Sequence, residues 1–291
     1  MRSLSPAVGI GYRSAIDEWT RAHLGDFDVL EITLDAYLGG GRGVRSAIYD
    51  LVGRIPLTAH GIGLSIGTDA PLDEGYLDEI AETIERLKPQ AYSEHLAFTR
   101  VPHQDLATLL PLPKTEAVAA DVIAKAQYVQ SRVPVPFLLE NISYLFDWPD
   151  STLSDADFLN LIFGETQAGL LLDLENLLLN SHNHRFNPYE FLDSLTPGIV
   201  KEIHLAGGMS IDEDGLARPC LVDSHSHPVP DEALDLLEYA LTRHAPANII
   251  IERDARFDAV SELLDDIARV RARLANTVGN FHVQSTFGSA G

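Results

Sequence analysis

GLLLDLENLLLN (residues 169–180), a polar segment and then VKEIHLAG (residues 200–207) carry the pattern that specifies the architecture of this chain. Each stretch contains a short apolar run of strand character, and each run ends at a side chain suited to chemistry: Asp173 in the first and His204 in the second. A buried parallel strand is largely hydrophobic, and side chains at its carboxyl end project into the mouth of an α/β fold. The pattern therefore predicts a site built at strand ends.

The same pattern recurs along the whole chain. We expect strands at residues 8–12, 29–32, 57–62, 91–96, 135–140, 170–174, 200–205 and 248–252. The helical patterns between them lie at residues 15–24, 44–52, 72–87, 115–131, 155–163, 188–195, 231–243 and 259–274. Alternation of strands and helices indicates a parallel sheet, and eight repeats of it predict an α/β fold of the (β/α)8 TIM-barrel class.

We expect a single domain at residues 1–276 and a flexible C-terminal tail at residues 277–291. No linker rich in Pro, Gly or Ser interrupts the alternation, and barrels of about 250 residues commonly form one domain. The last stretch is small and polar with little periodicity, which is typical of a frayed end.

The composition limits the partners and the metal ligands that this protein can use. Asp and Glu number 43 against 21 Lys and Arg, a formal charge of −22. Such an acidic surface repels nucleic acid unless the site is locally basic or filled with metal. No apolar run is long enough to span a membrane and the N-terminus lacks a signal-peptide core, so we expect a cytoplasmic protein without a membrane partner. The lone Cys220 excludes an intramolecular disulfide and a thiolate cluster. Any bound metal must use mainly oxygen and nitrogen ligands.

Side chains of the types that bind metal ions lie at the carboxyl ends of seven of the eight expected strands. They are Glu31, His60, His95, Glu140, Asp173 with Asn176, His204 and Glu252, and the loop after the seventh strand adds Asp223 and His225. A single such residue would more often cap a helix or face water. Asp and Glu together number 43 of the 291 residues and His numbers 11, so finding one of them by chance at the ends of seven strands is improbable. Because the carboxyl ends of barrel strands meet on one face, these side chains should converge there. Imidazoles and carboxylates without thiols are ligands of zinc, iron or manganese.

These segments also resemble a known family. The motifs are LTAHGIGLSIGT, YSEHLAFT, LLENI, LLDLEN, EIHLAGG, DSHSHPV and IIIERD. Together, over residues 8–274, they are similar to those of the multinuclear non-haem iron-dependent oxidative enzymes, which modify ribosomally made peptides. The resemblance implies a xylose isomerase-like TIM barrel, related to apurinic endonucleases, with two or three iron ions in mixed Fe(II)/Fe(III) states at its mouth.

The resemblance also implies the ligand set. It assigns His60 and His95 to one iron with Glu140 as a bridge, Asp173, His204 and Glu252 to a second, and Asn176, Asp223 and His225 to a third. Glu140, Asp173 and His204 are the residues we expect to be catalytic, since a bridging carboxylate can hold two cations close together. The endonucleases have Asp-x-x-His where this chain has Asp173-Leu-Glu-Asn176. A neutral amide binds metal more weakly than imidazole does, so the third site should be looser.

The activity implied by the resemblance is oxidation of a residue, expected to be cysteine, in a ribosomally synthesised precursor peptide, with O2 as co-substrate and a partner protein that binds the leader. Hydrogen would be removed from the cysteine β-carbon. Two alternatives stay open: a sugar isomerase or phosphoesterase that uses a divalent metal as Lewis acid, and a non-catalytic peptide-binding or metal-binding subunit. Zinc without iron would favour the first, and the absence of oxygen consumption would favour the second.

Other polar residues near the expected site could orient the ligands or could have no part in the site. Glu31, Ser93, Glu94 and Asp254 are placed to accept the second ring nitrogen of a metal-bound histidine, although alternation can set Glu94 on the outer face, and Asn141 could bond near Glu140. His182 and His184 are either extra ligands or part of a polar loop, and His227 could replace His225 as a ligand. Arg253 and Arg256 could bind a substrate carboxylate. We interpret Cys220 as structural. The glycines of residues 61–67 do not form a phosphate loop, so no nucleotide cofactor is implied.

Overall fold

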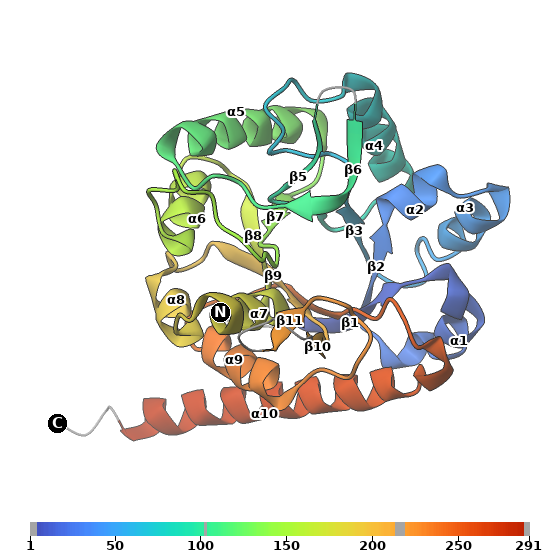
Figure 1. Cartoon of the computed structure of the whole chain (residues 1–291). Coiled ribbons are helices and arrows are strands. Elements are labelled where there is room, and N and C mark those ends of the chain that lie inside the picture. The colour runs from blue at the N-terminus through green and yellow to red at the C-terminus, as the bar shows by residue number, and fades with distance from the viewer. Residues whose placement is uncertain (1–4, 102–103, 213–218, 288–291) are drawn as a thin grey trace.

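Eight parallel strands close into a barrel, as the alternation predicts (Figure 1). The structure is a computed structural model that describes residues 5–101, 104–212 and 219–287. The barrel strands are β1 (Ala7–Tyr12), β2 (Val29–Thr33), β3 (Leu57–Gly61), β4 (Tyr92–His95), β7 (Phe137–Glu140), β8 (Gly169–Asp173), β9 (Val200–Leu205) and β12 (Asn248–Ile251). They pair in the order β1-β12-β9-β8-β7-β4-β3-β2, and β1 closes the ring by pairing with both β2 and β12. All eight strands lie where the sequence predicts them, within a residue or two at each end.

Helices surround the barrel and cover the outer faces of its strands (Figure 1). They are α1 (Asp17–Ala22), α2 (Leu34–Gly39), α3 (Arg42–Tyr49), α4 (Glu74–Leu87), α5 (Glu116–Arg132), α6 (Asp155–Gly164), α7 (Leu174–His184), α8 (Pro188–Ser194), α9 (Asp231–Leu241) and α10 (Glu262–Phe287). Short 3-10 turns lie at Ser14–Ile16, Leu24–Asp26 and Phe257–Ala259. No helix in the described ranges combines the length and apolarity needed to cross a membrane.

Local signals explain several of these boundaries. Thr115 and Ser154 accept hydrogen bonds from backbone amides of the first turns of α5 and α6, which is the usual arrangement at a helix N-terminus. Asp173 has two roles, because it ends β8 and also caps α7 by accepting from the Asn176 amide. Gly9 permits close packing inside the sheet, since a Cβ there would lie 1.9 Å from the Val29 carbonyl oxygen.

The structure differs from the predicted pattern in α2, α7 and α10. The pattern predicts no helix at α2. It predicts a polar loop at residues 182–184, but α7 continues through His184 and ends where Arg185 adopts a left-handed conformation, φ 64°. Asn, Ser and His are weak helix formers, so burial of the α7 leucines and the Asp173 cap stabilise a helix that the local sequence does not indicate. α10 runs to Phe287, past the predicted end of the helix at residue 274 and past the predicted domain limit at residue 276. The flexibility of residues 277–291 stays a prediction.

Two antiparallel hairpins, absent from the predicted pattern, extend from the carboxyl ends of barrel strands. β5 (Phe98–Val101) pairs with β6 (Gln104–Leu110) after β4, and β10 (Met209–Ile211) pairs with β11 (Cys220–Val222) after β9. In Figure 1 the two hairpins flank the opening of the barrel. They therefore add walls around the mouth at which the candidate residues end.

Candidate metal centre

Two histidines and a carboxylate from three adjacent strands form a first group of donor atoms. His60 is the last residue but one of β3, His95 ends β4 and Glu140 ends β7. The Nε2 atoms of His60 and His95 each lie 3.3 Å from Glu140 Oε2, and 3.4 Å from one another. All three donor atoms are thus close enough to hold a single metal ion.

A second group lies next to the first and shares Glu140 with it. Its members are Glu140, Asp173, His204 and Glu252, all buried. His204 Nδ1 lies 3.0 Å from Glu252 Oε2 and 3.4 Å from Glu140 Oε1. Glu140 therefore directs one oxygen toward each group, which is the geometry of a carboxylate that bridges two cations.

The remaining candidates lie at the edge of the second group and are not among its members. They are Asn176, Asp223 and His225. His225 Nε2 lies 2.7 Å from Asp223 Oδ1, and His225 Nδ1 lies 3.8 Å from Glu252 Oε2. The backbone of His225 has a φ of 45°, a left-handed conformation that is uncommon for a non-glycine residue and is found at functional sites. Asn176 lies one turn into α7, beside Asp173. A third position is thus less compact than the other two.

Buried polar atoms without hydrogen bonds indicate that the centre fits metal ions. Among the described residues, Asp173 Oδ2 and Asn176 Oδ1 form no hydrogen bond. Glu140 Oε2, His204 Nδ1 and His225 Nε2 also form none, and the charged groups close to them are other candidate ligands. An unpaired buried polar atom is costly, and native proteins rarely leave one unsatisfied. Such atoms are expected where cations complete the site. The nitrogen and oxygen donors suit iron, zinc or manganese.

The charges of the two groups depend on one another. Burial raises the pKa of Glu140, but His95, His204 and His60 more than offset burial and lower that pKa to about 2. Burial, together with Glu140 and Asp223, raises the pKa of Asp173 well above its usual range. The metal-free centre therefore favours the protonated form of Asp173, and a cation bound beside it would favour the carboxylate.

His204 is held from its other side by two carboxylates deeper in the barrel. Its Nε2 atom lies 3.0 Å from Glu31 Oε2, as predicted, and 3.9 Å from Glu202 Oε1. Burial and the neighbouring Glu31 raise the pKa of Glu202 to about 7. Our sequence interpretation missed Glu202, although it precedes His204 by two residues on one strand and must share its face. Glu31 orients the ring so that Nδ1 faces the second group.

The other predicted supporting residues divide into two kinds. Ser93 Oγ lies 2.8 Å from His60 Nδ1, and Asp254 Oδ2 lies 3.0 Å from His225 Nδ1. Glu94 accepts from the Tyr92 hydroxyl at 2.7 Å rather than from a histidine of the described residues, on the outer face that alternation allowed. Asn141 bonds the backbone of Asp173 rather than Glu140: its Nδ2 donates to the carbonyl and its Oδ1 accepts from the amide, both at 2.9 Å.

Arg13 is a further contributor that the sequence interpretation missed. Its Nη2 atom lies 3.1 Å from Glu252 Oε1, and its Nε atom pairs with Asp254. Glu252 therefore uses one oxygen for Arg13 and leaves the other for His204 and the second group. Arg13 directly follows β1, so the rule of strand ends, applied to the one strand without a candidate, would have found it. Arg253, by contrast, is buried and pairs with Glu262 and Asp266.

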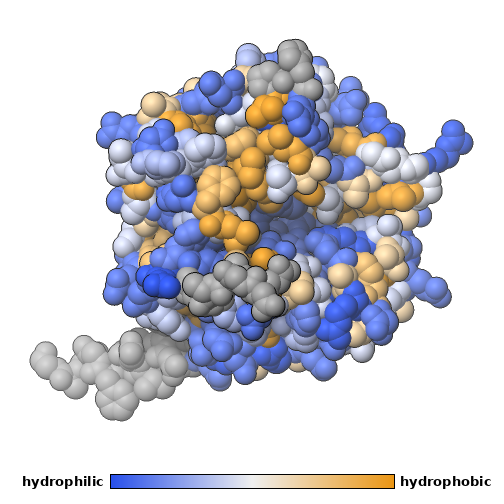
Figure 2. Space-filling view, viewed as in Figure 1, coloured by the Kyte–Doolittle hydropathy of each residue, from blue (hydrophilic) through white to orange (hydrophobic). Residues whose placement is uncertain are grey.

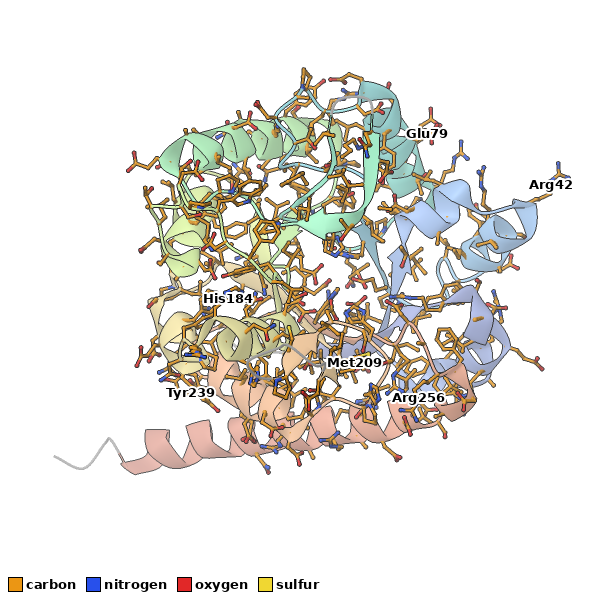
Figure 3. The ribbon with its side chains drawn as sticks, in the orientation of Figure 1. Arg42, Glu79, His184, Met209, Tyr239 and Arg256 are labelled. Carbon is orange, nitrogen blue, oxygen red and sulfur yellow. The ribbon has the colours of Figure 1, made fainter. Side chains whose placement is uncertain are left out.

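The other candidate histidines and the cysteine contact groups close to them in the fold. They are His182, His184, His227 and Cys220. His182 and His184 each place Nε2 near a backbone carbonyl, of Pro219 at 3.3 Å and of Tyr144 at 2.8 Å. Figure 3 shows His184 among the surrounding helices rather than at the barrel centre. His227 Nδ1 lies 2.8 Å from Ser226 Oγ, and none of these three histidines belongs to a donor group in the described structure. The Cys220 thiol lies on β11, 3.6 Å from Asn183 Oδ1.

The mouth around the centre has an acidic floor and a partly apolar rim. Figure 2 shows a hollow with a hydrophilic interior and apolar side chains gathered above it. Five exposed apolar residues follow the strands that carry the donor groups: Ile62, Val101, Leu145, Phe146 and Met209. Figure 3 places Met209 near the edge of the opening. Exposed apolar side chains clustered beside a hollow are typical of a surface that binds a partner or an extended ligand.

Comparison with known proteins gives a matching family and several relatives. A family model described as the RiPP precursor modification enzyme MbnB/TglH/ChrH matches residues 7–275. A UPF0276 protein of Acaryochloris marina is 33% identical over 257 residues, covering 88% of this chain and 91% of its own length. One from Caulobacter vibrioides is 33% identical over 281 residues, covering 94% and 96%.

Solved structures share the fold at low sequence identity. A xylose isomerase domain-containing protein from Salmonella typhimurium has a TM-score of 0.59 and 13% identity, covering 94% of this chain and 99% of its own. A xylose isomerase-like TIM barrel protein from Mycobacterium smegmatis, in complex with magnesium, has a TM-score of 0.58 and 13% identity, covering 90% and 88%. These similarities confirm the xylose isomerase-like barrel.

Proposed function

Because this chain belongs to the MbnB/TglH/ChrH family of RiPP precursor modification enzymes, we propose that it is an iron-dependent oxidoreductase that oxidises a cysteine of a ribosomally synthesised precursor peptide with O2. The observation that carries this proposal is the pair of buried donor groups joined by Glu140, with unpartnered atoms directed into them. Two ions held side by side suit a reaction in which one site binds the peptide and the other binds O2.

The chain's own residues define where each ion would be held. His60, His95 and Glu140 would hold one, and Asp173, His204 and Glu252 would complete the other around Glu140. Asn176, Asp223 and His225 are our candidates for a third ion, whose looser arrangement agrees with the neutral amide of Asn176. Bound iron would supply a site for the cysteine thiolate, a site for O2 and the capacity to take electrons from the peptide.

Supporting residues keep this arrangement ready for substrate. Glu31 and Ser93 hold the rings of His204 and His60, and Arg13 occupies one oxygen of Glu252. Glu140, Asp173 and His204 are the residues we propose to be catalytic. Since Glu140 is ionised throughout the neutral range, it can bind cations without first losing a proton.

The lining of the barrel mouth supports a peptide as the substrate. The apolar rim offers contacts that a sugar or a phosphate ester would not use, while the acidic floor is suited to metal. We also propose that a partner protein binds the leader of the peptide. The rim would then contact the segment that contains the cysteine.

Anaerobic purification followed by elemental analysis tests the metal, and oxygen uptake tests the reaction. With iron, a reductant and a cysteine-containing precursor peptide encoded beside the gene, we expect oxygen consumption and loss of hydrogen mass from the peptide. A Cys→Ser peptide is the matched control and should stay unmodified. Zinc without iron, together with no oxygen uptake, would refute the proposal and favour Lewis-acid chemistry on the same barrel.

A further inference from the structure

The exposed apolar side chains of this protein are distributed unevenly. Among the described residues, the large apolar side chains that are exposed are Tyr49, Ile62, Val101, Tyr128, Leu145, Phe146, Tyr189 and Met209. The three tyrosines lie on the outer helices α3, α5 and α8. The other five form the apolar rim, have no hydroxyl group, and all follow barrel strands that carry candidate ligands. Single exposed apolar residues are normal, but a group of them at one end of a fold indicates a binding surface.

The apolar rim occupies one arc of the mouth. Its residues follow β3, β4, β7 and β9, which belong to one continuous run of the ring, β9-β8-β7-β4-β3. The other three strands, β2, β1 and β12, are followed by none of these exposed apolar residues and instead by the charged residues Asp35, Arg13 and Asp254. The mouth therefore has an apolar side and a charged side.

The most exposed part of the rim is backed by a layer of aromatic rings. Leu145 is 65% exposed and Phe146 is 45% exposed. The centroid of the Phe146 ring lies 5.6 Å from that of Trp148, which lies 6.4 Å from that of Phe98 on β5. Trp148 Nε1 donates to the Pro111 carbonyl at 2.7 Å. These rings join the loop after β7 to the hairpin after β4, so the exposed pair rests on a fixed support.

The loop after β7, residues 141–148, is also hydrogen-bonded to the metal centre. Asn141 bonds the backbone amide and carbonyl of the candidate ligand Asp173, both at 2.9 Å. Asn180 on α7 donates to one backbone carbonyl of this loop and accepts from one of its backbone amides, also at 2.9 Å. The loop is thus held in place without a ligand, and a preorganised surface loses little conformational entropy when it binds one.

We propose that the apolar rim binds an aliphatic or aromatic side chain next to the reactive cysteine, so that the substrates are precursor peptides with apolar residues beside this cysteine. The inference rests on the proposed function, in which a peptide enters the mouth. Rim residues come from loops around a hollow with a hydrophilic interior (Figure 2), and a peptide chain entering the hollow can contact several of them. The donor groups contain carboxylates and the chain has a formal charge of −22, so acidic residues beside the cysteine would be repelled.

Binding of a peptide that cannot react tests the rim separately from the chemistry. The probe is the precursor peptide encoded beside the gene, labelled with a fluorophore and with its cysteine replaced by Ser, and anisotropy measures its affinity for the full chain. We expect Leu145→Ser and Phe146→Ser each to weaken binding about tenfold with unchanged metal content. Tyr49→Ser is the matched control, because Tyr49 is 56% exposed on an outer helix, and it should bind as wild type does.

Changes in the peptide provide the second half of the test. Replacement of the apolar residues beside the cysteine position by Asp should weaken binding to wild-type protein at least tenfold, and replacement by Ser should weaken it less. The Ser replacement should have a smaller effect on Phe146→Ser protein than on wild type, since the contact is already lost there. Should the rim variants fail to fold, as judged by circular dichroism, the peptide series with wild-type protein still decides the matter.

The failures of the two proposals are distinguishable. Wild-type affinity in both folded rim variants would overturn the inference and leave the proposed function standing, and so would a precursor with only acidic or glycine residues beside its cysteine. A wild-type dimer in sedimentation that Phe146→Ser dissociates, with unchanged peptide affinity, would show that the rim joins two copies of this chain and would overturn the inference too. If the rim variants lose peptide affinity but the iron-loaded protein takes up no oxygen, the inference holds and the proposed oxidation is refuted.

Discussion

Replacement of Glu140 by Gln and of Asp173 by Asn should affect metal binding unequally. Both changes remove one charge and keep the size of the side chain, and Asn can retain the cap of α7 that Asp173 provides. Glu140 belongs to both donor groups, whereas Asp173 belongs only to the second. We therefore expect Glu140→Gln to weaken both metal sites, and Asp173→Asn to weaken one.

The electrostatic environment of Glu140 sets the size of the effect. Against the cost of burial, the surrounding imidazoles bring its pKa from 4.5 to about 2. At about 1.4 kcal/mol per pKa unit, this protein environment favours the carboxylate by roughly 3 kcal/mol. With metal ions in place of the imidazolium charges, a neutral amide would lose a stabilisation of this order, and since about 1.4 kcal/mol corresponds to tenfold in affinity, we expect a loss on the order of 100-fold at each site.

The assay is metal titration of apoprotein, followed by elemental analysis after gel filtration. Wild-type protein should retain all of its ions, Asp173→Asn should lose those of the second group, and Glu140→Gln should retain least. Circular dichroism and thermal unfolding of the metal-free variants check that the barrel is intact. Wild-type metal content in both folded variants would refute the ligand assignment, and a greater loss in Asp173→Asn would refute Glu140 as the bridge.

Three further outcomes are expected. Arg13→Ala frees one oxygen of its partner carboxylate and should lower metal affinity about 10- to 100-fold; wild-type affinity in a direct titration would contradict a positioning role. Burial opposes protonation of His204 and His225, but neighbouring carboxylates raise both pKa values well above 6.5, so metal binding near neutral pH should release protons and weaken as the pH falls. Calorimetry in two buffers of different ionisation enthalpy measures this release, and identical heats would contradict it. Gly9→Ala, whose Cβ would lie 1.9 Å from a backbone oxygen of β2, should lower Tm strongly, whereas Gly25→Ala, with nothing within 4 Å, should not.

Much of the fold could be predicted because its signals are local. A buried parallel strand is recognisable from a short apolar run, and the polar residue after it marks the carboxyl end. Eight such runs were sufficient to predict the barrel, which in turn predicts that His60, Glu140 and Asp173 meet on one face. The α7 helix and the two hairpins were missed, since burial and contacts with distant segments stabilise them.

The sequence by itself determined which side chains stand at the strand ends, and hence that nitrogen and oxygen donors would meet at the barrel mouth. Only the tertiary structure decided that Glu140 turns one oxygen toward each donor group, that Arg13 holds Glu252, and that Glu202 lies beneath His204. The physical reason is that residue order specifies strand identity and alternation locally, whereas distances between side chains depend on the register of strands that are far apart in sequence and on the closure of the ring.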